Sequence, residues 1–111
     1  MPGERRWTLE GVRAVLDDVR TRTARAAERA EALVLEREGV EPAERAAIDL
    51  RIQALVERWA KEVEALGAEA KGVWLVDFDN GSGYYCWRWP ETELGWFHGY
   101  EDGFAGRTRI Q

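Results

Sequence analysis

The spacing of apolar and small residues near the start of the chain limits the possible folds more than any other feature. From Leu9 to Leu33 these residues recur alternately three and four positions apart. The positions are Leu9, Val12, Leu16, Val19, Thr23, Ala26, Ala30 and Leu33. This spacing places a narrow stripe along one side of an α-helix, as in helices that pair with another helix. We therefore predict a long helix that packs along this stripe against a second one.

The boundaries of two helices can be read from their end residues. Thr8 suits the N-cap of the first helix, Gly39 suits its end, and Pro42 suits the first position of the next helix. In the second helix apolar residues recur at Ile48, Ile52, Leu55, Trp59, Val63 and Leu66. We predict helices over about residues 8–38 and 42–66. The short link between them predicts an antiparallel hairpin.

The pattern changes from helical to strand-like after Gly72. Residues of high β-propensity occupy about residues 73–78, 84–89 and 94–98, and turn-forming residues separate them. Short links between three such runs indicate a three-stranded antiparallel β-meander, followed by a Gly-rich C-terminal loop. At 111 residues we expect a single domain, residues 1–111, of the α+β class.

The predicted helices are much longer than the predicted strands. Helices of about 27 residues span roughly 40 Å, whereas strands of about five or six residues span only about 17–20 Å. Such a sheet cannot cover the hairpin, and Leu50 and Val56 widen the apolar arc of the second helix. We therefore expect a homodimer that forms through the helices. The alternative is a sheet that lies lengthwise along shorter helices.

Charge and composition argue against several kinds of partner. The net charge of -5 and the pI of about 5.0 argue against binding to nucleic acid or to an anionic membrane surface. No apolar run reaches the roughly 18 residues of a membrane-spanning helix, and the first residues suggest no signal peptide. The single cysteine excludes an internal disulfide and predicts a cytoplasmic protein. An excess of Arg over Lys is thermophile-like, although a GC-rich genome produces the same bias.

His98 is the only histidine and the first candidate for catalysis. Its ordinary pKa near 6.5 suits a general acid or base, with Asp77, Glu101 or Asp102 as its partner. The alternative, more usual for a lone His among aromatic residues, is a hydrogen-bonded structural role. Cys86 is expected to be a buried inert thiol, and the alternative is a nucleophile that His98 holds as the thiolate. The chain has no second His and no familiar spacing of metal ligands, so we predict no metal and no cofactor.

A glycine-rich turn, Gly103-Phe104-Ala105-Gly106-Arg107, is the candidate binding segment. Exposed backbone N–H groups and a guanidinium can together hold a phosphate or a carboxylate. With the nearby aromatic residues, the turn predicts a pocket for a small anionic ligand. The predicted ligand-binding residues are Trp87, Trp96, His98, Gly103, Phe104, Gly106 and Arg107. The alternative is structural: the aromatic residues form the core and Arg107 pairs with a nearby Asp or Glu.

Several short motifs resemble those of a known family. They are W-T-L-E at 7–10, G-V-W-L-V-D-F at 72–78, C-W-R-W at 86–89, W-F-H at 96–98 and G-F-A-G-R at 103–107. Together they are similar, over nearly the whole chain, to the bacterial and archaeal family of unknown function called DUF2203. The resemblance implies a small cytoplasmic protein, and it transfers no activity and no catalytic residue.

Two functions remain open at this point. The leading prediction is a non-catalytic, dimeric interaction or small-ligand-binding module, with its dimer surface on the helices and its pocket near the C-terminal sheet. The alternative is a small enzyme that acts on an anionic substrate. In that enzyme His98 is the acid or base, Asp77 or Glu101 orients it, and Arg107 holds the anion.

Overall fold

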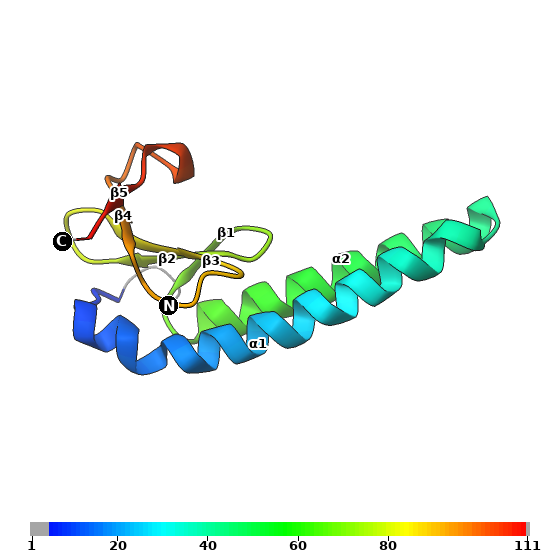
Figure 1. Cartoon of the computed structure of the whole chain (residues 1–111), viewed down its shortest axis with the longest axis horizontal. Coiled ribbons are helices and arrows are strands. Elements are labelled where there is room, and N and C mark those ends of the chain that lie inside the picture. Colours follow the sequence, from blue (N-terminus) through cyan, green and yellow to red (C-terminus); the bar gives the residue numbers. More distant parts are fainter. Residues whose placement is uncertain (1–4, 111) are drawn as a thin grey trace.

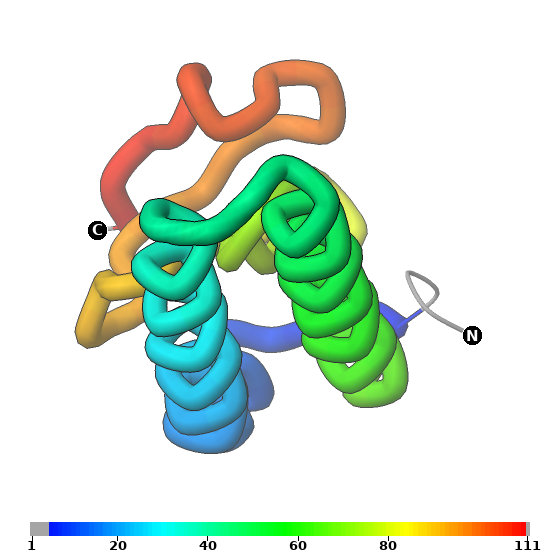
Figure 2. The backbone as a smooth tube through the Cα atoms, turned by 90° about the vertical axis from the view of Figure 1, so that its right-hand side faces the viewer, coloured from blue at the N-terminus to red at the C-terminus, as the bar shows by residue number. Residues whose placement is uncertain are grey.

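The computed structural model describes residues 5–110 and has an α+β fold, in which a helical hairpin packs against a sheet (Figure 1). Helix α1 spans Leu9–Glu36, the short 3₁₀ helix η1 spans Arg37–Gly39, and helix α2 spans Pro42–Ala65. The end-on view shows the two helices side by side (Figure 2). The predicted antiparallel hairpin is therefore confirmed. Among the described residues, no helix combines the length and the apolar character needed to cross a membrane.

The helices begin where the local sequence predicts. The hydroxyl of Thr8 accepts a hydrogen bond from the backbone N–H of Gly11 at 3.0 Å, which satisfies one free donor of the first turn. Pro42 is the first residue of α2, where its fixed φ suits the helix and its missing N–H costs nothing. The helices end at Glu36 and Ala65, within one turn of the predicted ends.

The sheet has five antiparallel strands in the order β1-β2-β3-β4-β5, so the predicted meander is confirmed but the predicted count of three strands is wrong. The strands are β1 Glu69–Gly72, β2 Leu75–Asp79, β3 Tyr84–Arg88, β4 Trp96–His98 and β5 Thr108–Arg109. The two additional strands lie at the two edges. Neither contains the run of alternating apolar residues that marks a strand in sequence. Each is a strand because its backbone pairs with that of a neighbouring strand.

Two strands also start later than predicted. The strand expected at 73–78 starts at Leu75, because Val73 and Trp74 form the turn after β1. Trp74 has a φ of 60°, and its ring packs edge-on against Trp59 with 5.0 Å between the ring centroids. The strand expected at 94–98 starts at Trp96. The predicted C-terminal loop contains a 3₁₀ helix, η2, over Phe104–Gly106, and then β5.

One face of the sheet packs on the hairpin and forms the core. Val76, Phe78 and Trp87 have no exposed surface and belong to this face. The helices contribute mainly Val12, Leu16, Val19, Ala26, Trp59 and Val63. Trp87 is thus a core residue, and its indole N–H donates to the backbone carbonyl of Glu91 at 2.9 Å. Trp87 therefore packs in the core, as the structural alternative describes.

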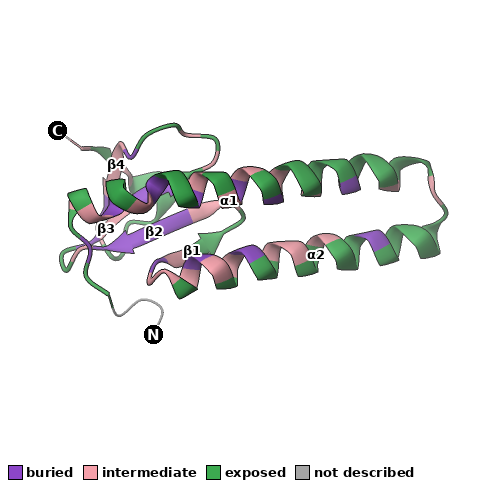
Figure 3. Ribbon diagram, turned by 90° about the horizontal axis from the view of Figure 1, so that it is seen from below, coloured by how far each residue is buried: buried purple, intermediate pink, exposed green. Residues whose placement is uncertain are grey.

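The core covers only part of the hairpin. It reaches Ala26 in α1 and Leu55 in α2, and we call this part the near half. The far half, residues 27–36 and 42–54, projects beyond the sheet, where most positions are exposed (Figures 1 and 3). The molecule is accordingly elongated, with extents of 49 × 26 × 24 Å.

Candidate functional site

The face of the sheet that points away from the helices carries a buried polar cluster. Residues directly opposite one another on paired strands point to the same face. Asp77 lies opposite Cys86, Cys86 lies opposite Trp96, and Tyr84 lies opposite His98. The register therefore brings Asp77, Cys86 and His98 to one face from three separate strands. Their exposed fractions are only 3%, 0% and 4%.

His98 is held through both ring nitrogens. Its Nε2 lies 2.9 Å from Asp77 Oδ2, and its Nδ1 lies 2.7 Å from the backbone oxygen of Gly99. A carbonyl oxygen only accepts hydrogen bonds, so Nδ1 carries a proton and donates it to Gly99. The contact between Nε2 and Oδ2 then needs one more proton, shared between His98 and Asp77. Of the predicted partners of His98, Asp77 is the one that the structure brings to it.

Cys86 is a neutral thiol in these surroundings. Burial, and after it the neighbouring carboxylate of Asp77, raise the pKa of the Cys86 thiol to about 12, while Arg107 opposes the change. Nη1 of Arg107 lies 3.9 Å from the sulfur. The thiol is therefore a poor nucleophile, because the thiolate is the reactive form.

Asp77 completes a set of three possible metal ligands. One ligand atom each from Asp77, Cys86 and His98 lies within 4.8 Å of the others. The second carboxylate oxygen, Oδ1 of Asp77, is buried and has no hydrogen-bond partner among the described residues. The sequence prediction did not group these three residues, because they lie 9 and 12 residues apart and meet only through strand register.

Arg107 does not face an open anion site. Its guanidinium makes two hydrogen bonds to Glu91, at 3.2 and 2.8 Å. It also lies over the rings of Trp96 and Phe104, with 4.6 and 4.2 Å from the guanidinium carbon to the ring centroids. The structural alternative, in which Arg107 pairs with a local acid, therefore describes this residue. Glu91 was not among the predicted site residues, because it lies in a turn far from Arg107 in sequence.

The glycines of the candidate turn have structural roles. Gly103 has a φ of 63°, in the left-handed region that favours glycine. A Cβ at Gly106 would lie 2.7 Å from the Cβ of Asp102, which is too close. The Asp102 carboxylate accepts a hydrogen bond from the N–H of Gly99 at 3.1 Å, so Asp102 shapes the loop. Glu101 is exposed and makes no hydrogen bond or ion pair with another residue in the range 5–110.

The fold and the site define a small α+β protein in which a helical hairpin carries a five-stranded meander with a buried Asp-Cys-His cluster. The chain belongs to the family described as "Uncharacterized conserved protein (DUF2203)", whose model matches residues 3–110. The resemblance found in the sequence motifs is thereby confirmed. No curated protein and no solved structure matches the chain significantly.

Proposed function

We propose that this protein binds one divalent transition-metal ion of the zinc type through Asp77, Cys86 and His98. The observation that carries the proposal is the approach of three different donor groups to within 4.8 Å of one another in a buried place. Carboxylate, thiolate and imidazole are the groups that hold Zn²⁺ in proteins. A thiol and an imidazole also argue against Mg²⁺ and Ca²⁺, which prefer oxygen ligands.

The unpaired oxygen of Asp77 supports a cation at this place. Oδ1 is buried and has no hydrogen-bond donor among residues 5–110, and a buried carboxylate oxygen without a partner costs free energy. A bound cation removes this cost, because it attracts both carboxylate oxygens and replaces the proton that His98 and Asp77 otherwise share.

The groups around the cluster would orient and stabilise the ligands. A histidine that binds a metal commonly donates its other ring N–H to a carbonyl or carboxylate, as Nδ1 of His98 does to Gly99. A metal-bound thiolate carries negative charge, and Arg107 lies 3.9 Å from the sulfur of Cys86. Glu91 in turn fixes Arg107. The positive charge of Arg107 would therefore balance the negative charge of the thiolate, so this guanidinium is compatible with a bound metal ion.

Burial of the ligands favours a structural or regulatory metal over a catalytic one. At most 4% of each ligand residue is exposed, whereas a catalytic metal needs a position that substrate can reach. An ion here would join β2, β3 and β4 through their side chains. This role agrees with the non-catalytic function that we predicted from the sequence.

Cobalt titration tests the proposal directly. We expect Co²⁺ to bind at one equivalent and to produce a thiolate-to-metal charge-transfer absorption, which reports the Cys86–metal bond in the unaltered protein. Zn²⁺ should displace Co²⁺ and release protons, because the ligands must lose theirs. The variants Cys86→Ser, Asp77→Asn and His98→Gln should each lower affinity by more than the roughly 100-fold caused by losing an outer hydrogen-bond partner of a ligand.

Glu101→Gln is the matched control, because it removes an exposed carboxylate close in sequence to His98. It should bind Co²⁺ as the unaltered protein does, and circular dichroism should show that every variant remains folded. Binding without a thiolate absorption, or equal affinity in Cys86→Ser, would contradict the proposal.

The enzyme that we considered as the alternative has partial support. The 2.9 Å contact between His98 and Asp77 is the pair that an acid or base would need. The support for Arg107 as the group that binds the anionic substrate is weaker, because Arg107 already forms two hydrogen bonds to Glu91. A buried His98 also has poor access to a substrate, so we favour metal binding.

A homodimer through the helices is a second, separate proposal. The specific observation in its favour is the exposure of large apolar residues in the far half: Val34 at 44%, Leu35 at 64% and Leu50 at 66%. Pairing of two hairpins would bury them. We also propose a cytoplasmic location, where a free thiol such as that of Cys86 stays reduced.

Sedimentation velocity at micromolar concentration tests the dimer. We expect the unaltered protein to sediment as a dimer and Leu50→Ser to dissociate. Val73→Ser is the matched control, because Val73 is 58% exposed but lies in the turn after β1. A monomer in the unaltered protein, or equal dissociation in both variants, would contradict a dimer through the hairpin.

A further inference from the structure

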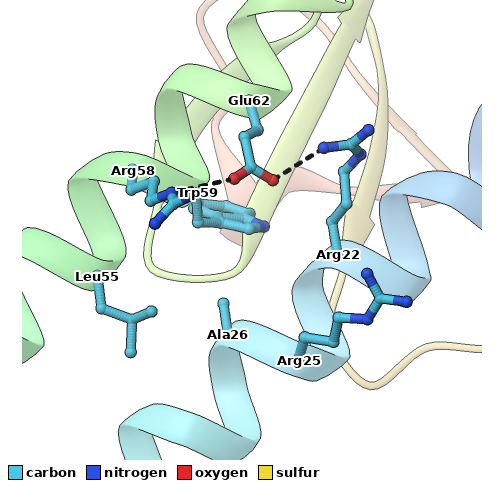
Figure 4. Close-up of a pocket in the computed structure, with 7 residues that line it drawn as sticks. All are labelled: Arg22, Arg25, Ala26, Leu55, Arg58, Trp59 and Glu62. Atoms are coloured by element: carbon cyan, nitrogen blue, oxygen red, sulfur yellow. Dashed lines mark hydrogen bonds and ion pairs between the residues drawn. The ribbon is translucent and has the colours of Figure 1, made fainter.

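A groove between the two helices differs from the sheet site in both shape and charge. One stretch, of about 310 Å³, has Ala26, Leu55 and Trp59 among its lining residues, together with Arg22, Arg25 and Arg58 (Figure 4). The adjoining stretch has a similar volume of about 310 Å³ and adds further residues of the same two kinds. Leu55 and Arg58 line both stretches, so the groove is continuous along the hairpin.

The groove is cationic in a chain that is acidic as a whole. Five arginines and a single carboxylate, Glu62, line the two stretches, while the chain has a net charge of -5. Arg22 bonds Glu62 at 3.0 Å, and Arg58 lies 3.7 Å from the same carboxylate. A concave surface with charges of one sign concentrates the field and attracts ions of opposite sign.

Three of these arginines have no carboxylate partner among residues 5–110. Arg25, Arg29 and Arg51 are exposed and form no ion pair with another residue in the part of the chain that the structure describes. By contrast, Arg37 near the tip of the hairpin is paired with Asp49 at 2.8 Å. The groove therefore presents guanidinium groups that remain available to an outside anion.

The floor of the groove needs no polar partner. Trp59 is 2% exposed, and its indole N–H already donates to the hydroxyl of Thr23 at 2.8 Å. Ala26 and Leu33 are 8% and 2% exposed, so the floor consists of apolar side chains with almost no contact with solvent. A ligand matched to this lining combines an apolar body, which lies along the floor, with an anionic group, which the arginines bind.

We infer that the groove binds a small amphipathic anion, with a carboxylate or phosphate group on an aliphatic body. The aliphatic body lies along Ala54 and Leu55, which keep exposed surface, and the anionic group bonds Arg25 and Arg29. The sequence suggested an anionic ligand at Arg107, but Glu91 occupies that guanidinium. The groove shares no residue with the Asp77, Cys86 and His98 cluster, so this inference is independent of the proposed metal site.

Calorimetric titration with decanoate and with decyl phosphate tests the inference. Binding of both probes is expected at one equivalent, and comparison of the two shows which anionic group the groove prefers. Within a series of carboxylates, each added methylene should tighten binding about fourfold, because each buried methylene contributes about 0.8 kcal/mol. Decanol, which lacks the charge, should bind at least about tenfold more weakly, since a hydrogen bond to a charged group is lost.

Variants separate the arginines of the groove from charge in general. Arg25→Gln and Arg29→Gln should each weaken decanoate binding about tenfold. Lys61→Gln is the matched control, because it removes one exposed positive charge from α2 outside the groove. Circular dichroism establishes that each variant is folded, and binding of decanoate should be the same before and after chelation of metal.

Three results would overturn the inference. The first is equal weakening by Lys61→Gln and Arg25→Gln, which would show attraction to net charge only. The second is equal affinity for decanol and decanoate. The third is a change of oligomeric state in Arg25→Gln without any decanoate binding to the unaltered protein, which would assign the groove to a contact between copies of this chain.

Discussion

The near half and the far half of the hairpin are built from the same two helices but differ in what buries their side chains. In the near half Val12, Val19 and Val63 have no exposed surface, because the sheet closes over both helices. In the far half Leu33 and Ile48 are buried, but Leu35 and Leu50 are 64% and 66% exposed. Two helices alone can bury one row of side chains, and a third layer is needed to bury more. The near half therefore contributes most of the buried core, and the far half leaves large apolar side chains exposed to solvent.

The largest difference between the halves should follow from a cavity in the near half. Phe78→Ala removes a ring with no exposed surface from the centre of the core. We expect the free energy of unfolding to fall by about 3–5 kcal/mol, through lost transfer energy and an unfilled cavity. Urea denaturation followed by circular dichroism measures the change. A loss below about 1 kcal/mol would mean that the sheet contributes little to the core.

Leu33→Ala makes the corresponding change in the far half. Leu33 is 2% exposed but lies outside the core cluster beneath the sheet, so the site can collapse or admit water. We expect a loss of about 2 kcal/mol in the free energy of unfolding, at the low end for such a substitution. The same denaturation experiment applies, at equal protein concentration for both variants. A loss equal to that of Phe78→Ala would contradict the division into two halves.

Thr23→Val tests a buried polar link between the helices of the near half. The Thr23 hydroxyl donates to the backbone oxygen of Val19 at 2.7 Å and accepts from Trp59 Nε1 at 2.8 Å. Valine keeps the shape but leaves the indole N–H without an acceptor, so we expect a loss of about 1.5 kcal/mol. Thr23→Ser, which keeps the hydroxyl, should recover the hydrogen-bond part of this loss. Equal stability of the valine variant and the unaltered protein would show that water replaces the hydroxyl.

The smallest effect is expected at the tip of the far half. Arg37 bonds both carboxylate oxygens of Asp49, at 2.8 and 3.1 Å, but both side chains are substantially exposed. Arg37→Gln should cost only about 0.5 kcal/mol of unfolding free energy, because water and salt screen an exposed ion pair. The difference should vanish at high salt in thermal denaturation. A cost above about 2 kcal/mol would show that the tip is stabilised by more than this pair.

The helices were predictable because their signals are local. The stripe from Leu9 to Leu33, the cap at Thr8 and the proline at 42 act within one or two helical turns. The edge strands β1 and β5 were not predictable in the same way. Glu69–Gly72 has the sequence of a turn or a helix end, and it becomes a strand because β2 offers it backbone hydrogen-bond partners.

The candidate site was predictable only in part. The sequence named His98 and Asp77 as possible partners, and their side chains are 2.9 Å apart. It could not show that Cys86 joins them, because a register shift of one residue would send that side chain to the opposite face. Nor could it choose between an outside anion and Glu91 as the partner of Arg107, since the two are 16 positions apart.

The amino-acid sequence by itself determined the two long helices, the change to strands after Gly72 and the family, since periodicity, caps and motifs are local properties. The tertiary structure alone decided which side chains meet. Strand register gathered Asp77, Cys86 and His98 on a covered face, and the side-by-side packing of the two antiparallel helices gathered the arginines beside Trp59. Contacts between distant positions depend on how whole elements pack, and no short stretch of sequence carries that information.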